Sequence, residues 1–249
     1  MLLIIRTINE FSAPKFLYIL SGVITNLLLP ERKQYLSHII TSNFSSHPIK
    51  ALEIGSWFGE GSTKVILEKL PKNSDFFLID SWKPYISKED LTKKNIYQTV
   101  NNLNFSAIYN ILKIIRLHEK KSSGGGGVKN VSVNLIRGKS YDFLKIFKNN
   151  KFDFIYIDGS HYYHDVIKDI NISKLLIKKD FGIICGDDLE KKPTAKLIKF
   201  SKEYITEDYV QGFHPGVMLA VNEAFEKVNM KKGFWWVYCK NKKFTININ

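Results

Sequence analysis

The chain has 249 residues, of which 44% are hydrophobic and 13% aromatic, and its formal net charge is +13. This composition excludes an intrinsically disordered chain and suffices for an α/β domain with a substantial core. The only two cysteines, Cys185 and Cys239, fall in predicted strands. We therefore expect reduced core thiols, with neither a disulfide framework nor a zinc site.

The positive charge is spread along the chain rather than gathered in one segment. Lysine pairs stand at many predicted element ends, for example Lys120–Lys121, Lys178–Lys179 and Lys242–Lys243. We therefore do not expect nucleic acid as the partner of this chain. Acidic glycans, nucleotide sugars and an anionic membrane surface fit the charge equally well.

Residues 1–49 precede the first predicted strand, and we interpret them as an N-terminal extension of two or three helices. Its most apolar part, Phe16 to Leu29, is interrupted by polar residues and is shorter than the roughly 20 residues that span a bilayer. We expect this part to pack as a helix, in a cytoplasmic protein without a membrane span. The extension either covers the substrate side or joins the subunits of a homo-oligomer, and the sequence leaves both open.

Residues 50–249 are predicted to form one domain, because strand-like and helix-like segments alternate over this range. Helical patterns include a long insert over about 88–121, part of which could form a lid, and the glycine-rich segment 122–127 reads as a surface loop. The alternation predicts a doubly wound, mostly parallel sheet that ends in an antiparallel hairpin. The predicted strands are Lys50–Ile54, Asp75–Asp80, Val131–Ile136, Phe152–Asp158, Phe181–Asp187, Phe234–Lys240 and Phe244–Ile248.

The turn after the first strand carries glycines at positions 55, 59 and 61, and the acid Glu53 stands two residues before the first of them. Such a strand–turn–helix unit brings bare backbone to a ligand at the carboxyl edge of a sheet. The order G-x-x-x-G-x-G differs from the G-x-G-x-x-G of dinucleotide sites and resembles motif I of class I S-adenosylmethionine (SAM) methyltransferases. The resemblance implies cofactor contacts from Glu53, Gly55, Ser56 and Gly59.

The second strand also ends in an acid, Asp80. A carboxylate at this strand end is placed to accept hydrogen bonds from the hydroxyls of a ribose. Together the two features predict a nucleoside cofactor; the alternative for the glycines alone is an ordinary strand-to-helix turn.

Three further acids stand at the ends of two later strands. Asp158 ends one strand, and Asp187 and Asp188 end the next. If these strands are neighbours, the carboxylates converge and need a cation between them, and oxygen-only ligands suit Mg²⁺ or another hard divalent ion. The alternative is that Asp187 or Asp188 caps a turn and that Asp158 contacts only the cofactor.

His161 follows Asp158 by three residues and is predicted to face the same edge. A histidine here could accept the proton of an acceptor hydroxyl, or could simply bind backbone at a helix start. His214, in the loop before a late helix, is a second candidate for the base.

These segments resemble a narrower group of class I methyltransferases. Ile157–His161, Gly182–Asp188 and Pro215–Val217 are similar to the group that contains cephalosporin hydroxylase-like proteins and macrolide-sugar (macrocin, mycinamicin) O-methyltransferases, over roughly residues 51–240. The group implies a Rossmann-like, mostly parallel seven-stranded sheet. It also implies Mg²⁺ ligation by the three acids, His161 as base and Ser140 beside the adenine.

The sequence therefore predicts a SAM-dependent, divalent-metal-assisted O-methyltransferase that acts on a hydroxyl of a sugar, glycan or secondary-metabolite precursor. The alternatives are a metal-independent methyltransferase of a small molecule or RNA, and a non-catalytic module that binds SAM or a nucleotide. The expected partner is a small-molecule or glycan substrate.

Overall fold

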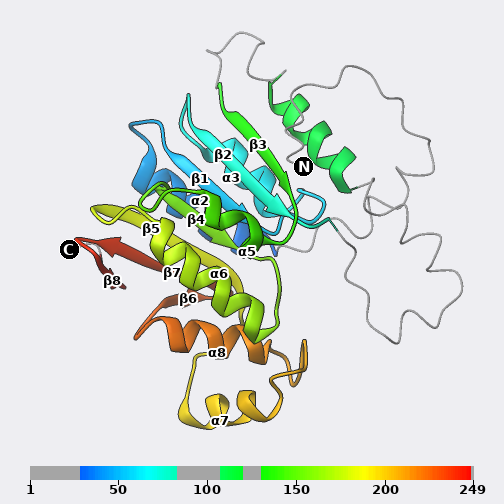
Figure 1. Cartoon of the computed structure of the whole chain (residues 1–249), viewed down its shortest axis with the longest axis vertical. Coiled ribbons are helices and arrows are strands. Elements are labelled where there is room, and N and C mark those ends of the chain that lie inside the picture. The colour runs from blue at the N-terminus through cyan, green and yellow to red at the C-terminus, as the bar shows by residue number, and fades with distance from the viewer. Residues whose placement is uncertain (1–28, 83–106, 120–129, 248–249) are drawn as a thin grey trace, which may run out of the picture.

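Short, continuously apolar runs form the centre of the molecule, as expected for parallel strands that are buried on both faces. The structure is a computed structural model that describes residues 29–82, 107–119 and 130–247. In these residues eight strands form one sheet in the order β3-β2-β1-β4-β5-β7-β6, and β8 pairs with the second half of β7 (Figure 1). The strands are β1 Lys50–Ile54, β2 Asp75–Asp80, β3 Ser132–Arg137, β4 Phe154–Ile157, β5 Phe181–Leu189, β6 Asn229–Lys231, β7 Gly233–Lys240 and β8 Lys243–Thr245.

The first five strands are parallel and the later ones run against their neighbours. β1 pairs with β2 on one side and with β4 on the other, so the order of the sheet reverses between β1 and β4. β7 then pairs antiparallel with β5, β6 and β8. In open sheets of this kind, ligands bind at the carboxyl ends of the strands beside the point of reversal.

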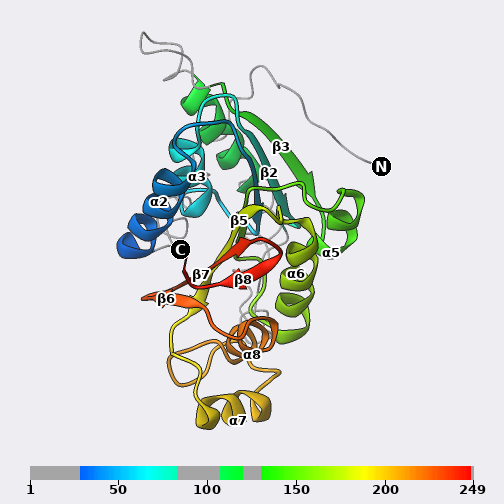
Figure 2. The same cartoon turned by 90° about the vertical axis from the view of Figure 1, so that its left-hand side faces the viewer.

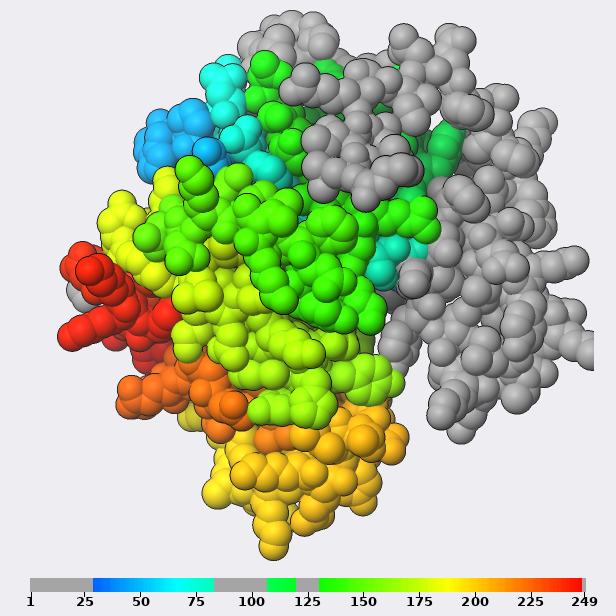
Figure 3. All heavy atoms as spheres, in the orientation of Figure 1, coloured from blue at the N-terminus to red at the C-terminus, as the bar shows by residue number. Residues whose placement is uncertain are grey.

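Helices cover both faces of the sheet (Figure 2). On one face lie α2 Pro30–Phe44, α3 Ser62–Lys69 and a helix over residues 107–119, and their apolar residues form one core with the sheet. On the other face lie the short α5 Ser140–Phe143, the 3₁₀ turn η2 Leu144–Ile146, and the helices α6 Tyr163–Leu176 and α8 Pro215–Ala224. Helix α7, Ala195–Glu203, packs against α8 at one end of the molecule (Figures 1 and 3).

The alternation of side chains along β1 shows how the two cores are separated. Ala51 belongs to the core under α2 and α3, whereas Leu52 and Ile54 belong to the core under α6 and α8. Glu53 therefore points to the same side as Ala51, toward α3.

The predicted fold class is confirmed, but several element boundaries differ. Helix α8 ends at Ala224, and an additional edge strand, β6, follows it, so that the sheet has eight strands rather than the predicted seven. The helix ends because Phe225 is extended and packs its ring against Trp235 and Phe244. Such tertiary packing overrides the helical pattern.

Strand β5 extends two residues further than predicted, through a register shift between Gly186 and Leu189. Both cysteines are buried and unpaired, as predicted. The predicted lid and glycine-rich loop lie mostly outside the described residues, and the part that is described, 107–119, is helical. Among the helices that the structure describes, none combines the length and the apolar character needed to cross a bilayer.

Candidate active site

The glycine turn after β1 lies directly against the end of β4. Gly55 has a φ of +83°, and a Cβ there would lie 2.0 Å from the carbonyl oxygen of Asp158. Only glycine combines this backbone conformation with this close approach. The turn therefore presents bare backbone at the point where the strand order reverses.

Asp80 at the end of β2 holds this turn in place. Its Oδ2 accepts hydrogen bonds from the backbone N–H groups of Ser56 at 2.8 Å and Trp57 at 2.9 Å, and its Oδ1 accepts from the N–H of Trp82 at 2.6 Å. Ser56 Oγ also contacts the carboxylate and accepts a hydrogen bond from the Trp82 indole. Sequence reasoning placed Asp80 at the ribose; the structure gives it a further role as the anchor of the turn.

Glu53 lies beneath the glycine turn and does not line the pocket that opens beside it. It is fully buried, and its two carboxyl oxygens accept hydrogen bonds from Ser62 Oγ at 2.5 Å and Thr63 Oγ1 at 2.7 Å. Burial raises the pKa of Glu53 to about 8, although the two hydroxyl contacts oppose the shift. The side chain thus ties β1 to the first turn of α3, and its predicted cofactor contact remains a prediction.

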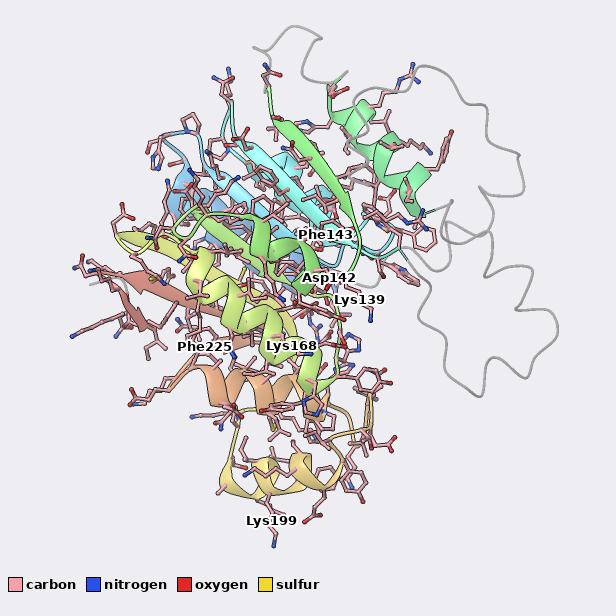
Figure 4. All side chains as sticks on the ribbon, viewed as in Figure 1. Lys139, Asp142, Phe143, Lys168, Lys199 and Phe225 are labelled. Carbon is pink, nitrogen blue, oxygen red and sulfur yellow. The ribbon has the colours of Figure 1, made fainter. Side chains whose placement is uncertain are left out.

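A pocket of about 190 Å³ opens beside the turn, at the carboxyl ends of β1 and β2. Ser140 lines it, as its predicted place beside the adenine requires, and its hydroxyl donates a short hydrogen bond to the carboxylate of Asp169 on α6. Burial raises the pKa of Asp169 to about 7. Lys139, the N-cap residue of α5, also lines the pocket (Figure 4). The lining residues are Ile54, Gly55, Ile79, Asp80, Ser81, Gly138, Lys139, Ser140, Tyr141, Gly159, Ser160, Asp165 and Asp169.

The paired acids at the end of β5 sit in a bulge. Asp188 has a φ of +65°, a left-handed conformation that is uncommon for a residue with a side chain. Asp187 Oδ1 accepts a hydrogen bond from the backbone N–H of Asp188. β-Bulges redirect side chains near functional sites, and both carboxylates of this one reach the same nitrogen of Arg32.

The cation beside these acids is Arg32, from α2. Its Nη1 lies 2.6 Å from Asp187 and 3.0 Å from Asp188, and its Nε donates to the carbonyl oxygen of Lys232. Burial alone would lower the pKa of Arg32, but the attraction of the two carboxylates raises it further above its already high value. Sequence reasoning missed Arg32, because nothing in its local pattern indicates a contact some 155 residues away.

His161 lies between two carboxylates. Its Nε2 lies 3.0 Å from Asp188 Oδ2, and its Nδ1 lies 2.9 Å from Asp208 Oδ1. Burial opposes protonation, but the two carboxylate contacts outweigh it and raise the pKa of His161 to about 10. A histidine in this state already holds its proton at neutral pH, so the predicted base role requires that one contact be broken first.

His214 stands beside His161, with 4.2 Å between the ring centroids. Its Nδ1 lies 2.9 Å from Glu190 Oε1, and its backbone N–H donates to the other oxygen of the same carboxylate. Asp208 and Glu190, like Arg32, were not found from the sequence.

Asp158 ends β4 between the glycine turn and the β5 acids. Its carboxyl is half-buried beside the Tyr156 hydroxyl, 3.5 Å away, and desolvation together with the charges of Asp188 and Asp187 raises its pKa. The three predicted acids therefore share one edge. Within the described residues, however, the group whose donor atoms lie within 4.8 Å of one another is His161, Asp188 and His214. Ligation by Asp158 and Asp187 remains a prediction.

The comparisons with known proteins agree with this geometry. A family model described as "Methyltransferase domain" matches residues 52–189, more than half of the chain. The chain belongs to this methyltransferase family. The match begins in β1 and ends at the last residue of β5, so it contains the glycine turn, the pocket and the paired acids. A comparison of this chain with curated proteins found no match.

Solved structures with the same architecture are distant in sequence. A Corynebacterium glutamicum protein is 12% identical with a TM-score of 0.52, covering 90% of this chain and 88% of its own. The O-methyltransferase TomG of Streptomyces achromogenes, solved with SAM, is 11% identical with a TM-score of 0.50, covering 90% and 86%. A Methanococcus maripaludis protein is 12% identical with a TM-score of 0.51, covering 95% and 98%. At such identities the likeness shows the fold of the methyltransferase.

Proposed function

We propose that this methyltransferase uses SAM to methylate a hydroxyl group of a sugar or a related glycan or metabolite precursor, with the help of a divalent cation. The observation that carries the proposal is the position of Asp158. Its backbone touches Gly55 of the cofactor turn, and its side chain faces the acids of β5. The donor site and the histidine–carboxylate cluster are therefore adjoining parts of one edge.

The residues around the turn fit a nucleoside cofactor. Gly55 lets the turn pack directly against the backbone of Asp158, and Gly55, Asp80 and Ser140 all line the pocket. The structural neighbour TomG was solved with SAM itself. That name supports the choice of donor for this chain.

SAM supplies a methyl group on a cationic sulfur; the acceptor oxygen bonds to that carbon as the carbon–sulfur bond breaks, leaving S-adenosylhomocysteine and releasing the hydroxyl proton. The chain must orient the hydroxyl and take up its proton. His161 and Asp188, whose side chains are 3.0 Å apart, are polar groups of this edge that can orient the hydroxyl. His161 can also take up the proton, provided that its Nε2 is free of Asp188 and of a metal ion. Asp208 fixes the His161 ring through Nδ1.

The choice of a sugar acceptor rests on resemblance and on charge. The strand-end pattern resembles that of sugar O-methyltransferases, and the net charge of +13 attracts acidic or phosphorylated acceptors. Near the pocket, Lys139 and Lys168 both approach the Tyr141 ring, which places two ammonium groups at one rim. A nucleotide sugar combines the required hydroxyls with negative charge.

The proposal is tested by incubating the protein with methyl-labelled SAM, divalent ions and a panel of free sugars and nucleotide sugars. We expect labelled O-methyl product and S-adenosylhomocysteine in equal amounts, detected by mass spectrometry. His161→Ala should reduce the rate by at least about 100-fold while S-adenosylhomocysteine still binds. His164→Ala, an exposed histidine on α6, is the matched control and should keep full activity. Methylation of RNA or of amines in place of hydroxyls would overturn the proposal.

A further inference from the structure

We propose that His161, Asp188 and His214 form a binding site for a first-row divalent transition metal ion, and not for Mg²⁺. One donor atom from each lies within 4.8 Å of the others. His161 Nε2 and Asp188 Oδ2 are 3.0 Å apart. Two ligands at right angles, each about 2.1 Å from one ion, have a separation of about 3.0 Å.

Both imidazoles have the supporting contacts that metal-binding histidines require. Asp208 engages Nδ1 of His161 and Glu190 engages Nδ1 of His214, each at 2.9 Å. When Nδ1 donates its proton to a carboxylate, the ring is held in one orientation and Nε2 is left as a basic donor. Both rings, which come from different segments, make this Nδ1 contact to a carboxylate, and Nδ1 of His214 also lies 4.0 Å from Asp188 Oδ1.

The chain is built to bring these three segments together. Gly216, in the first turn of α8, lies so close to the loop after β4 that a Cβ would be 2.3 Å from the carbonyl oxygen of His161. Glycine here lets the start of α8, where His214 is the N-cap, approach His161 directly. The left-handed conformation of Asp188 in the β5 bulge turns its carboxylate toward the same point.

The local charge favours a divalent cation. Four carboxylates lie in this cluster: Asp187, which contacts Arg32, and Asp188, Glu190 and Asp208, which contact the rings. The side chain that pairs with the first three is Arg32, within 3.8 Å of each. A divalent ion would bring this cluster closer to neutrality.

The donor set also indicates which ion binds. Two imidazole nitrogens with one carboxylate suit Mn²⁺, Fe²⁺, Co²⁺ or Zn²⁺, whereas Mg²⁺ prefers oxygen ligands alone. The predicted Mg²⁺ set of Asp158, Asp187 and Asp188 shares one residue with this site. In the new assignment Asp187 serves to hold Arg32, and His161 is a ligand instead of the base.

This site extends the proposed function. Only the role of the ion in the reaction, and not the existence of the site, rests on that proposed function. Three protein donors leave positions open for the oxygens of an acceptor, at the edge where the methyl group would be delivered. The site itself can be tested without any methyl transfer.

The experiment measures metal binding by the full-length chain, freed of metal by chelation, without SAM or acceptor. Calorimetry with Mn²⁺, Co²⁺ and Mg²⁺, together with the visible spectrum of the Co²⁺ complex, should show one tight Mn²⁺ or Co²⁺ site and Mg²⁺ weaker by at least about 100-fold. His214→Ala should abolish the tight site, and Glu190→Gln should weaken it by about 10-fold. His164→Ala should bind as the wild type does.

Three outcomes would overturn the assignment: no tight binding by the folded wild type, Mg²⁺ binding that equals Mn²⁺ binding, or tight binding that survives His214→Ala. Circular dichroism establishes that each variant is folded, and Asp188→Asn provides a second ligand variant. Hydroxyl methylation that persists unchanged in chelated protein would reject the role given to the ion and leave O-methyl transfer standing. A tight metal site in a protein that methylates no hydroxyl would reject the proposed function and leave the metal site standing.

Discussion

Replacement of the buried acid under the cofactor turn gives a quantitative test of the structure. Glu53 is fully buried and has its pKa raised from 4.5 to about 8, chiefly by burial. Between these two pH values the folded protein holds a proton on Glu53 that the unfolded chain has lost. Folding is therefore stabilised by this group at low pH, and the stabilisation is lost as the pH rises toward 8, by about 1.4 kcal/mol per pH unit.

Glu53→Gln removes this dependence because the amide is neutral at every pH and can still bond to Ser62 and Thr63. Urea unfolding at pH 5.5 and pH 7.5 gives the free energy of unfolding of both proteins. Relative to the wild type, the free energy of unfolding of the variant should be about 3 kcal/mol higher at pH 7.5 than at pH 5.5. Glu31→Gln, an exposed acid on α2, is the matched control and should give a constant difference.

The same variant decides whether Glu53 contacts the cofactor. If Glu53 only ties β1 to α3, the affinity for S-adenosylhomocysteine should change by less than about threefold, since the substitution leaves the residues that contact the cofactor unchanged. A difference in unfolding free energy that does not change with pH would refute the burial argument. A large loss of affinity with unchanged stability would restore the contact predicted from the sequence.

Two further substitutions test the turn and the acid pair. Gly55→Ala should abolish S-adenosylhomocysteine binding and lower the melting temperature. The control is Gly212→Ala: Gly212 has a similar φ of +80°, but the atom nearest to an added Cβ is 3.9 Å away, so this change should cost only about 1 kcal/mol of strain. Equal effects of the two substitutions would refute the close-approach argument. Arg32→Met leaves buried carboxylates, Asp187 foremost, without their cation, and should cost about 3–5 kcal/mol of unfolding free energy, or roughly 10 °C in melting temperature. Arg116 is exposed, so Arg116→Met should leave the melting temperature unchanged. A melting temperature of Arg32→Met equal to that of the wild type would refute the pairing.

The sheet could be predicted from the sequence because its central strands are short apolar runs between turn residues. β1 and β2 have the predicted bounds, and the carboxyl ends of β4 and β5 adjoin as predicted. The misses share one physical cause, which is packing between distant segments. β6 forms because β7 offers a free edge, and Phe225 leaves the helix because Trp235 and Phe244 surround its ring.

The positions of the glycine turn and of the three acids at one sheet edge could be predicted, because strand ends alone determine them; the roles of these residues remain predictions. Its second half comes from residues that no local pattern marks. Asp208 lies in the connection between α7 and α8, and Glu190 follows the bulge at the end of β5. Their partners are set by how α8 packs, and helix packing of this kind is not encoded in residue spacing.

Arg32 shows most clearly why the first helix belongs with the site. α2 is anchored by its apolar residues Leu36, Ile40 and Phe44 in the same core as β1 and β4. That anchoring positions a guanidinium 2.6 Å from Asp187. A buried ion pair is a poor source of stability compared with apolar packing, so its retention at this point favours a role in orientation. By holding Asp187 and one oxygen of Asp188, Arg32 leaves the other Asp188 oxygen directed at His161, which is the geometry that both the proposed methyl transfer and the proposed metal site require.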